Sequence, residues 1–261
     1  MTFKETRPLY LLQEVARILR AENGCPWDRE QTHASLKPYL IEEAYEVYDA
    51  IESEDPEHLR EELGDLMYQV YAHAQIASEA GRFDIDDVAR LAADKLIGRH
   101  PHVFGDATAD TSDAVIRNWE LIKKAEKPHR ESILDGVPRH LPALLKAYRV
   151  QQKVSRVGFD WERIEGIVEK LDEELAEFKE AVALGAQEKM LEEIGDILFT
   201  IANIARFIKI NPEEALAKTV DKFITRFRFV EADVARSGRA LENVPLAELD
   251  AAWERAKTAE R

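Results

Sequence analysis

One acidic pattern occurs twice in this chain of 261 residues, and it constrains the fold more than any other feature. Residues 42–46 read Glu-Glu-Ala-Tyr-Glu, and residues 61–65 read Glu-Glu-Leu-Gly-Asp. The two motifs return as Glu-Glu-Leu-Ala-Glu at 173–177 and Glu-Glu-Ile-Gly-Asp at 192–196. Both are displaced by the same 131 residues (174 − 43 and 196 − 65). Motifs that are duplicated together predict that the repeat unit is a pair of helices.

The spacing of the acids places them on one face of each helix. Residues three or four apart are neighbours, so Glu174 and Glu177 project together, as do Glu193 and Asp196. If the helices pack antiparallel, four carboxylates converge, and each like-charged pair at ~4 Å costs about 4 kcal/mol at an effective dielectric constant of ~20. Several such pairs are a severe burden on a fold whose total stability is roughly 5–15 kcal/mol. A divalent cation removes the repulsion, and an all-oxygen site suits Mg²⁺, with Mn²⁺ as a substitute.

The repeat therefore predicts two metal sites. The expected ligands are Glu43, Glu46, Glu62 and Asp65 in the first copy and Glu174, Glu177, Glu193 and Asp196 in the second. The simpler interpretation is a solvated acidic face, the usual role of a charge run on a helix. In both copies, however, the acids run directly into an apolar segment, as Asp196 does into Ile197-Leu198-Phe199. This recurrence favours the metal interpretation.

The amino-acid composition excludes some classes of binding partner and indicates the cellular compartment. The chain holds 36 Lys and Arg against 51 Asp and Glu, a net charge of −15, which argues against a nucleic-acid surface or an anionic membrane as partner. The single Cys25 excludes an internal disulfide and fits a reducing compartment. No apolar run approaches the length of a membrane span, and the N-terminus is not typical of a signal peptide. We expect a soluble, cytoplasmic protein.

The periodicity of apolar residues predicts an all-α protein built from two tandem repeated helical domains. We expect these domains at residues 1–127 and 143–261, joined by a proline-containing linker at 128–142 that packs against the protein. Loops are expected at 22–28, 100–105 and 157–161. The expected helices are 9–20, 33–51, 56–80, 85–96, 112–127, 144–154, 162–184, 187–208, 212–236 and 246–258.

The two copies differ in their basic residues. Lys170 and Lys189 each stand four positions before a predicted ligand, whereas the first copy has Tyr39 and His58 at these places. Both copies continue with a Lys and an Arg four apart, which suits phosphate oxygens that a metal leaves unneutralised. These pairs are Lys95 and Arg99 in the first copy and Lys222 and Arg226 in the second. They are also compatible with ordinary surface charges.

The sequence allows two roles for each of two tryptophans and for one histidine-containing loop. Trp119 and Trp253 lie on amphipathic segments, and core packing is as compatible with each as stacking on a base. His100 and His102 flank Pro101 and are candidates for metal binding, although a rigid loop is the favoured interpretation.

The acidic motifs, Gly24-Cys25-Pro26-Trp27-Asp28, His100-Pro101-His102-Val103-Phe104 and Val157-Gly158-Phe159-Asp160-Trp161 together resemble the MazG family of nucleoside triphosphate pyrophosphohydrolases. The resemblance covers essentially the whole chain. It implies the all-α NTP pyrophosphatase fold and a homodimer in which helices of two chains complete each bundle. It also implies Mg²⁺-dependent hydrolysis of NTPs and dNTPs to the monophosphate and pyrophosphate, with broad base tolerance, in nucleotide-pool cleansing or the starvation response.

The resemblance also assigns residues by position. It implies that the second copy is the main hydrolysing site, because the first copy lacks the two lysines. Either Glu173 or Glu192 is the candidate proton acceptor. The implied nucleotide contacts are Lys170, Leu171, Asp172, Glu173, Glu174, Lys189, Met190, Leu191, Glu192, Asp196, Lys222, Phe223, Ile224, Thr225, Arg226 and Trp253.

Two rival functions were weighed against hydrolysis. A ferritin-like di-iron oxidase also places carboxylates on facing helices, but it requires Glu-x-x-His pairs, which neither acidic cluster contains. A nucleotide sensor or dimeric adaptor would bind without turnover. Tyr39 and His58 make this second rival more plausible for the first copy than for the second.

Overall fold

The computed structural model describes residues 7–126 and 131–259. Within these ranges the regular elements are all helical, which confirms the prediction of an all-α chain with a tandem repeat. The chain divides into two compact units, Met1–Pro128 and His129–Arg261. The boundary falls at the start of the predicted linker, of which residues 128–130 lie outside the described ranges. None of the described helices is both long enough and apolar enough to cross a membrane.

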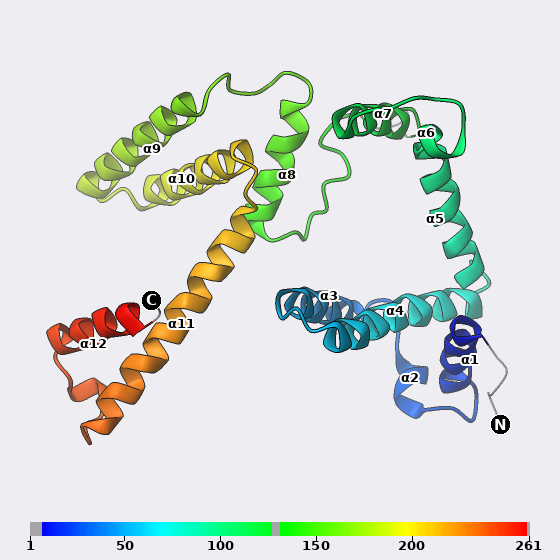
Figure 1. Ribbon diagram of the computed structural model, residues 1–261, viewed down its shortest axis with the longest axis horizontal. Coiled ribbons are helices and arrows are strands. Elements are labelled where there is room, and N and C mark those ends of the chain that lie inside the picture. The colour runs from blue at the N-terminus through cyan, green and yellow to red at the C-terminus, as the bar shows by residue number, and fades with distance from the viewer. Residues whose placement is uncertain (1–6, 127–130, 260–261) are drawn as a thin grey trace. The chain divides into compact units, whose positions relative to one another are not determined.

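The first unit is organised around the hairpin of α3 and α4, which Figure 1 shows side by side. Helix α1 packs on the second half of this hairpin, and α5 follows it toward the end of the unit. The helices are α1 Pro8–Arg20, α2 Pro26–Glu30, α3 Lys37–Glu52, α4 Pro56–Glu79, α5 Ile85–Arg99, α6 Pro101–Phe104 and α7 Ser112–Ala125.

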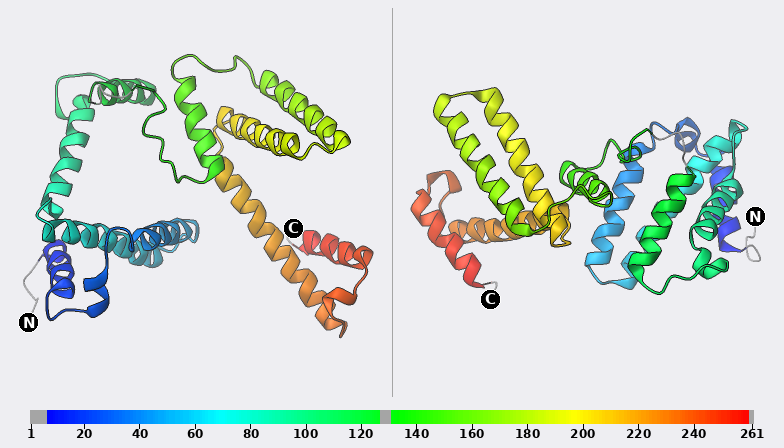
Figure 2. Two further views of the ribbon diagram at one scale, coloured as in Figure 1. Left: turned by 180° about the vertical axis from the view of Figure 1, so that it is seen from behind. Right: turned by 90° about the horizontal axis from the view of Figure 1, so that it is seen from above.

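The second unit repeats this hairpin as α9 and α10, with α8 packed on α10 and α12 packed on α11 (Figure 2). Its elements are α8 Ala143–Ser155, α9 Ile164–Leu184, α10 Gln187–Phe207, α11 Pro212–Arg236, the 3-10 turn η1 Leu241–Asn243 and α12 Leu246–Ala259. A small apolar cluster of Val230, Val234, Val244 and Ala252 joins α11 to α12.

The turn of each hairpin depends on one residue in the left-handed backbone region. Gly185 ends α9 with φ 67°, a conformation that glycine adopts without steric cost. Glu54, which stands at the same place of the repeat, has φ 55°. Asp55 then caps α4 by accepting hydrogen bonds from the backbone N–H groups of Glu57 and His58. These turns bring the acidic motifs of the two helices side by side.

Several sequence predictions about loops and helix bounds were wrong. Helix α3 begins at Lys37, four residues later than predicted, and α5 ends at Arg99, three residues later than predicted. Residues 26–30 and 101–104 form short helices where loops were expected, because a proline at the first position has the right φ and lacks only an N–H that needs no partner. Helix α9 begins at Ile164, two residues later than predicted. The predicted end of α7 at Lys127 lies outside the described residues.

Large apolar side chains remain exposed along both hairpins and along α11, whereas the buried core consists mainly of alanines and valines. On α11 the exposed residues recur at helical spacing, which marks one apolar face. The exposed apolar residues of α10 and α11 include Leu191, Ile194, Leu198, Ile201, Leu216, Val220, Phe223 and Ile224.

Candidate metal and nucleotide sites

The hairpin of the second unit brings three of its four predicted ligands together. Glu174 and Glu177 from α9 and Glu193 from α10 each offer an oxygen, and these oxygens lie within 4.8 Å of one another. Glu174 and Glu193 are only 5% and 3% exposed. Glu193 Oε2 is buried and has no hydrogen-bond partner. A buried carboxylate oxygen without a partner, beside two further carboxylates, fits a hard divalent cation.

The carboxylates of this cluster repel one another, and nearby positive charges reduce this repulsion. Burial raises the pKa of Glu193, and the neighbouring carboxylates of Glu177 and Glu174 raise it further, while Lys189 opposes the shift. Lys189 Nζ lies 3.5 Å from Glu193 Oε1. Lys170 Nζ lies 2.8 Å from Glu174 Oε1 and 2.9 Å from Glu173 Oε1. The two lysines thus partly neutralise the carboxylates predicted to hold the metal.

A cavity of about 590 Å³ adjoins the cluster, and Lys170, Glu174 and Asp196 are among the residues that line it. Asp196 therefore borders the site although it lies outside the close group of three carboxylates. Phe159 and Trp161 line the cavity from the loop before α9. The loop is fastened by an ion pair between Asp160 and Arg206, in which Arg206 Nη1 donates to Asp160 Oδ2 at 3.0 Å.

The cavity also contains polar residues that the sequence analysis did not identify, namely Gln151, Thr200 and Asn203. Gln151 is 5% exposed; its Nε2 donates to the Phe199 carbonyl at 2.8 Å, and its Oε1 has no partner. A signal was available in the repeat, because Thr200 stands 131 residues after Gln69, which lines the corresponding cavity of the first unit.

The first unit gathers Glu43, Glu62 and Asp65, again with one oxygen each within 4.8 Å. Glu46 lies outside this close group. Burial is the main cause that raises the pKa of Glu43; a hydrogen bond from Gln69 lowers it, and the charges of Asp65 and Glu46 raise it. His58 Nε2 lies 3.3 Å from Glu62 Oε1 and so takes the place that Lys189 holds in the second unit.

Several predicted nucleotide contacts do not line the cavity of their own chain. Within 170–174 and 189–192 only Lys170 and Glu174 line it. Residues 222–226 lie on α11, and Trp253 on α12 packs against Phe223, with ring centroids 5.0 Å apart, and beneath Arg226 at 5.8 Å. In the first unit Arg99 forms an ion pair with Glu126 and lies over the Trp119 ring. In each unit, the tryptophan therefore contacts the arginine that was predicted to bind phosphate.

The fold and the two sites define a class: an all-α protein with duplicated helical hairpins, each carrying a close group of carboxylates beside a cavity. The model of the MazG nucleotide pyrophosphohydrolase domain matches twice, at residues 31–104 and 162–230. The chain belongs to the MazG family.

Relatives match along nearly the whole chain. The nucleoside triphosphate pyrophosphohydrolase/pyrophosphatase MazG of Thermotoga maritima is 47% identical over 251 residues, which cover 95% of this chain and 96% of the relative. The nucleoside triphosphate pyrophosphohydrolase of Escherichia coli K12 is 45% identical over 254 residues, which cover 96% and 97%. An uncharacterised protein of Bacillus subtilis is 48% identical over 264 residues, 99% of this chain and 54% of that relative.

Proposed function

We propose that the chain is a nucleoside triphosphate pyrophosphohydrolase that hydrolyses NTPs and dNTPs, with broad base tolerance, to the monophosphate and pyrophosphate in the cytoplasm. Family membership and the names of its relatives support this class of activity. The observation that carries the proposal is the close group of Glu174, Glu177 and Glu193, in which the buried Glu174 also lines a cavity large enough for part of a nucleotide. A role in nucleotide-pool cleansing or the starvation response belongs to the same proposal.

Glu174, Glu177 and Glu193 are the proposed Mg²⁺ ligands, with Asp196 nearby and Mn²⁺ as a possible substitute. When bound, Mg²⁺ supplies charge neutralisation at the phosphates and lowers the pKa of a coordinated water. The donor set fits this ion because it consists of oxygens alone and includes the unpartnered Glu193 Oε2.

The lysines of the cluster then acquire a second role. Lys170 and Lys189 are bound to Glu174 and Glu193, the carboxylates assigned to the metal. With a divalent cation held by these carboxylates, the two ammonium groups would be free to bind the triphosphate, where a charged donor contributes more than in a surface pair. The lysines thereby hold the phosphates for hydrolysis between the α- and β-phosphates.

The proton of the attacking water requires an acceptor near the metal. Glu173 and Glu192 are exposed neighbours of the ligands, and Glu173 already receives a hydrogen bond from Lys170 at 2.9 Å. We assign one of these two carboxylates as the general base. The comparison of Glu173→Gln with Glu192→Gln, by kcat at saturating Mg²⁺, decides between them.

We also propose that the protein acts as a homodimer. The exposed apolar faces of α10 and α11 support this assembly, because a second copy would bury them. In such a dimer the α11 and α12 residues of one protomer, including Lys222, Arg226 and Trp253, are the candidates to complete the partner's site. The molar mass from light scattering tests the assembly, and a monomer at micromolar concentration would contradict it.

The activity is tested by incubation of the chain with ATP or dGTP and Mg²⁺, followed by assay of pyrophosphate and of the monophosphate. Equimolar release of both products is expected, and none in the presence of EDTA. Release of orthophosphate instead of pyrophosphate would contradict the proposed cleavage position. Nucleotide binding without any product would support the sensor interpretation.

A further inference from the structure

The first unit contains a cavity of its own beside its carboxylates. This cavity has a volume of about 220 Å³, and Trp27, Tyr39, Gln69 and Glu43 are among the residues that line it. Glu43 also belongs to the close group with Glu62 and Asp65. The volume is below that of sites for drug-sized ligands, so it suits one planar ring system rather than a whole nucleotide. A ligand in this cavity would extend its remaining groups toward the carboxylates.

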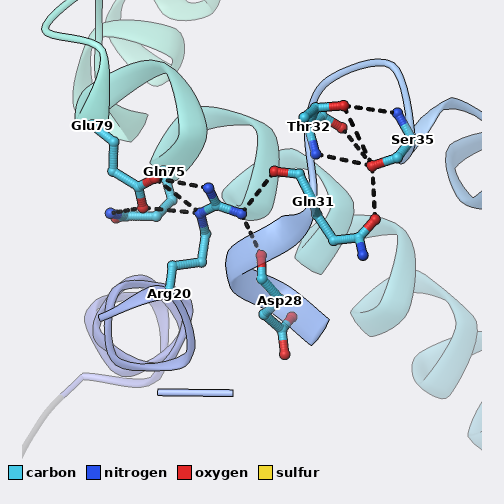
Figure 3. A network of polar contacts seen from close by, with 7 residues as sticks. All are labelled: Arg20, Asp28, Gln31, Thr32, Ser35, Gln75 and Glu79. Atoms are coloured by element: carbon cyan, nitrogen blue, oxygen red, sulfur yellow. Dashed lines mark hydrogen bonds and ion pairs between the residues drawn. The ribbon is translucent and has the colours of Figure 1, made fainter. Parts of the chain in front are cut away.

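The wall of this cavity is fixed by hydrogen bonds before any ligand arrives. Figure 3 shows Arg20 of α1 between Glu79 and the chain that carries Asp28 and Gln31. Arg20 donates to Glu79 Oε2 at 2.8 Å, to the Gln31 carbonyl at 3.1 Å and to the Asp28 carbonyl. The Tyr68 hydroxyl donates to Asp28 Oδ1 at 3.3 Å. A preorganised wall of this kind lowers the entropic cost of binding.

One buried acceptor on the wall of this cavity, the side-chain oxygen of Gln69, has no hydrogen-bond partner. Gln69 is 7% exposed, and its Nε2 donates to Glu43 Oε1 at 3.3 Å. Because a carboxylate only accepts, this bond fixes the orientation of the amide, and the buried Gln69 Oε1 is left without a partner. The carboxylate of Asp28 is a further acceptor on the wall. An N–H donor of a ligand in this cavity would satisfy Gln69 Oε1.

The aromatic residues favour a flat ligand. The Trp27 and Tyr39 rings lie edge to face, with centroids 5.8 Å apart, and Trp27 is 51% exposed. A free indole face next to a cavity is suited to stacking on a heteroaromatic ring. In the second unit, Lys170 and Thr200 occupy the repeat positions of Tyr39 and Gln69, so the two cavities present different surfaces.

We propose that the first unit is a separate nucleotide-binding site whose cavity, lined by Trp27 and Gln69, receives an amino-bearing base such as cytosine in preference to uracil. Cytosine offers an exocyclic amino group to Gln69 Oε1 and Asp28, whereas uracil presents a carbonyl oxygen at that position and is repelled by the acceptors. The inference rests on the proposed function in taking the ligand to be a nucleotide. It does not require that the first unit hydrolyse it.

The test is calorimetric titration of the full chain carrying Glu193→Ala with the α,β-methylene analogues of CTP and UTP, in the presence of Mg²⁺. We expect the CTP analogue to bind about tenfold more tightly than the UTP analogue, the effect of one buried hydrogen bond left unmade. Gln69→Leu should reduce this ratio to about one. Trp27→Ala should weaken both analogues at least fivefold, because both bases stack.

The matched control is Gln13→Leu, which changes a glutamine of α1 that does not line the cavity. This variant should keep the tenfold ratio, and circular dichroism should show all variants to be helical. Absence of binding, equal binding of the two analogues, or a ratio insensitive to Gln69→Leu would overturn the inference. Pyrophosphate release by the unmodified chain is measured separately, so failure of the proposed hydrolysis remains distinguishable.

Discussion

Lys170 Nζ lies 2.8 Å from Glu174 Oε1, so the ammonium group assigned to a substrate phosphate is bound to a carboxylate assigned to the metal. The hydrogen bond to Glu174 is the largest cause that raises the pKa of Lys170, and the bond to Glu173 adds to it. In the proposed function, the lysine and a divalent cation would compete for this oxygen. Such competition would link metal binding to release of the group proposed to bind phosphate.

The substitution Lys170→Met tests this link. Without Lys170, Lys189 alone of the two lysines offsets the repulsion within the cluster, so the rise in Tm on addition of Mg²⁺ should be larger than in the unmodified chain. The KM for ATP should also rise about tenfold, because a charge-assisted hydrogen bond to phosphate is lost. Differential scanning fluorimetry and steady-state kinetics measure the two effects. Lys179→Met, on the exposed side of α9, should change neither quantity, and an unaltered Mg²⁺ response in Lys170→Met would refute the competition.

Metal binding should be visible in stability alone. A ligand at 100 times its Kd stabilises a fold by roughly 2.7 kcal/mol. We therefore expect Mg²⁺ to raise the Tm of the second unit by several degrees. Glu193→Gln should abolish this rise, and in EDTA it should have a higher Tm than the unmodified chain, because it removes a buried charge. Glu188→Gln, an exposed acid in the first turn of α10, is the control that should behave like the parent.

The first unit should lose stability in mild acid through His73. His33 Nδ1 and His73 Nδ1 lie 2.9 Å apart, and burial, followed by the charge of His33, lowers the pKa of His73 from 6.5. The unfolded chain then binds a proton that the folded chain does not, so the unfolding free energy falls as the pH decreases below 6.5. Urea denaturation at pH 7.5 and at pH 5.5 measures this loss. His73→Asn should reduce the difference between the two pH values, and an undiminished difference would assign it to other groups.

The hairpin turn of the first unit offers a stabilising substitution. Glu54 has the left-handed conformation that Gly185 has in the second unit. The left-handed conformation costs a non-glycine residue roughly 1–2 kcal/mol. Glycine avoids this cost, but its larger loss of backbone entropy on folding offsets roughly 0.5–1 kcal/mol of the gain. Glu54→Gly should therefore stabilise the first unit by about 0.5–1 kcal/mol in urea denaturation. The reciprocal Gly185→Ala should destabilise the second unit, and a destabilising Glu54→Gly would show that the Glu54 side chain contributes more than its backbone strain costs.

The helices and the clustering of the acidic residues could be predicted from the sequence, because both depend on the spacing of residues within each copy of the repeat. Glu174 and Glu177 share a face by helix geometry alone, and the Gly185 turn brings Glu193 to them. Asp196 and Glu46, the fourth predicted ligand of each copy, lie outside the close groups of three carboxylates, and their part in metal binding stays a prediction. Residue spacing shows which residues share a face of one helix. It does not show how each helix is rotated about its own axis relative to its neighbour.

The cavities could not be predicted, because they depend on residues that are distant in sequence. Gln151 lies on α8 and meets α10 only through tertiary packing, and Arg206 reaches Asp160 across 46 positions. The ion pair of Asp160 fixes the loop that carries Phe159 and Trp161. By contrast, Trp253 was weighed as a base-stacking residue, and it packs against Phe223 and a small core. Apolar spacing alone does not distinguish these two environments.

The account depends on the carboxylates of the second hairpin acting together through a divalent cation. The most direct measurement is the rate of Mg²⁺-dependent pyrophosphate release from ATP by Glu193→Ala and, in parallel, by Glu62→Ala of the first unit, each shown to be helical. The account predicts that Glu193→Ala abolishes release and that Glu62→Ala retains most of it. Substantial release by Glu193→Ala, or loss of most activity in Glu62→Ala alone, would contradict it.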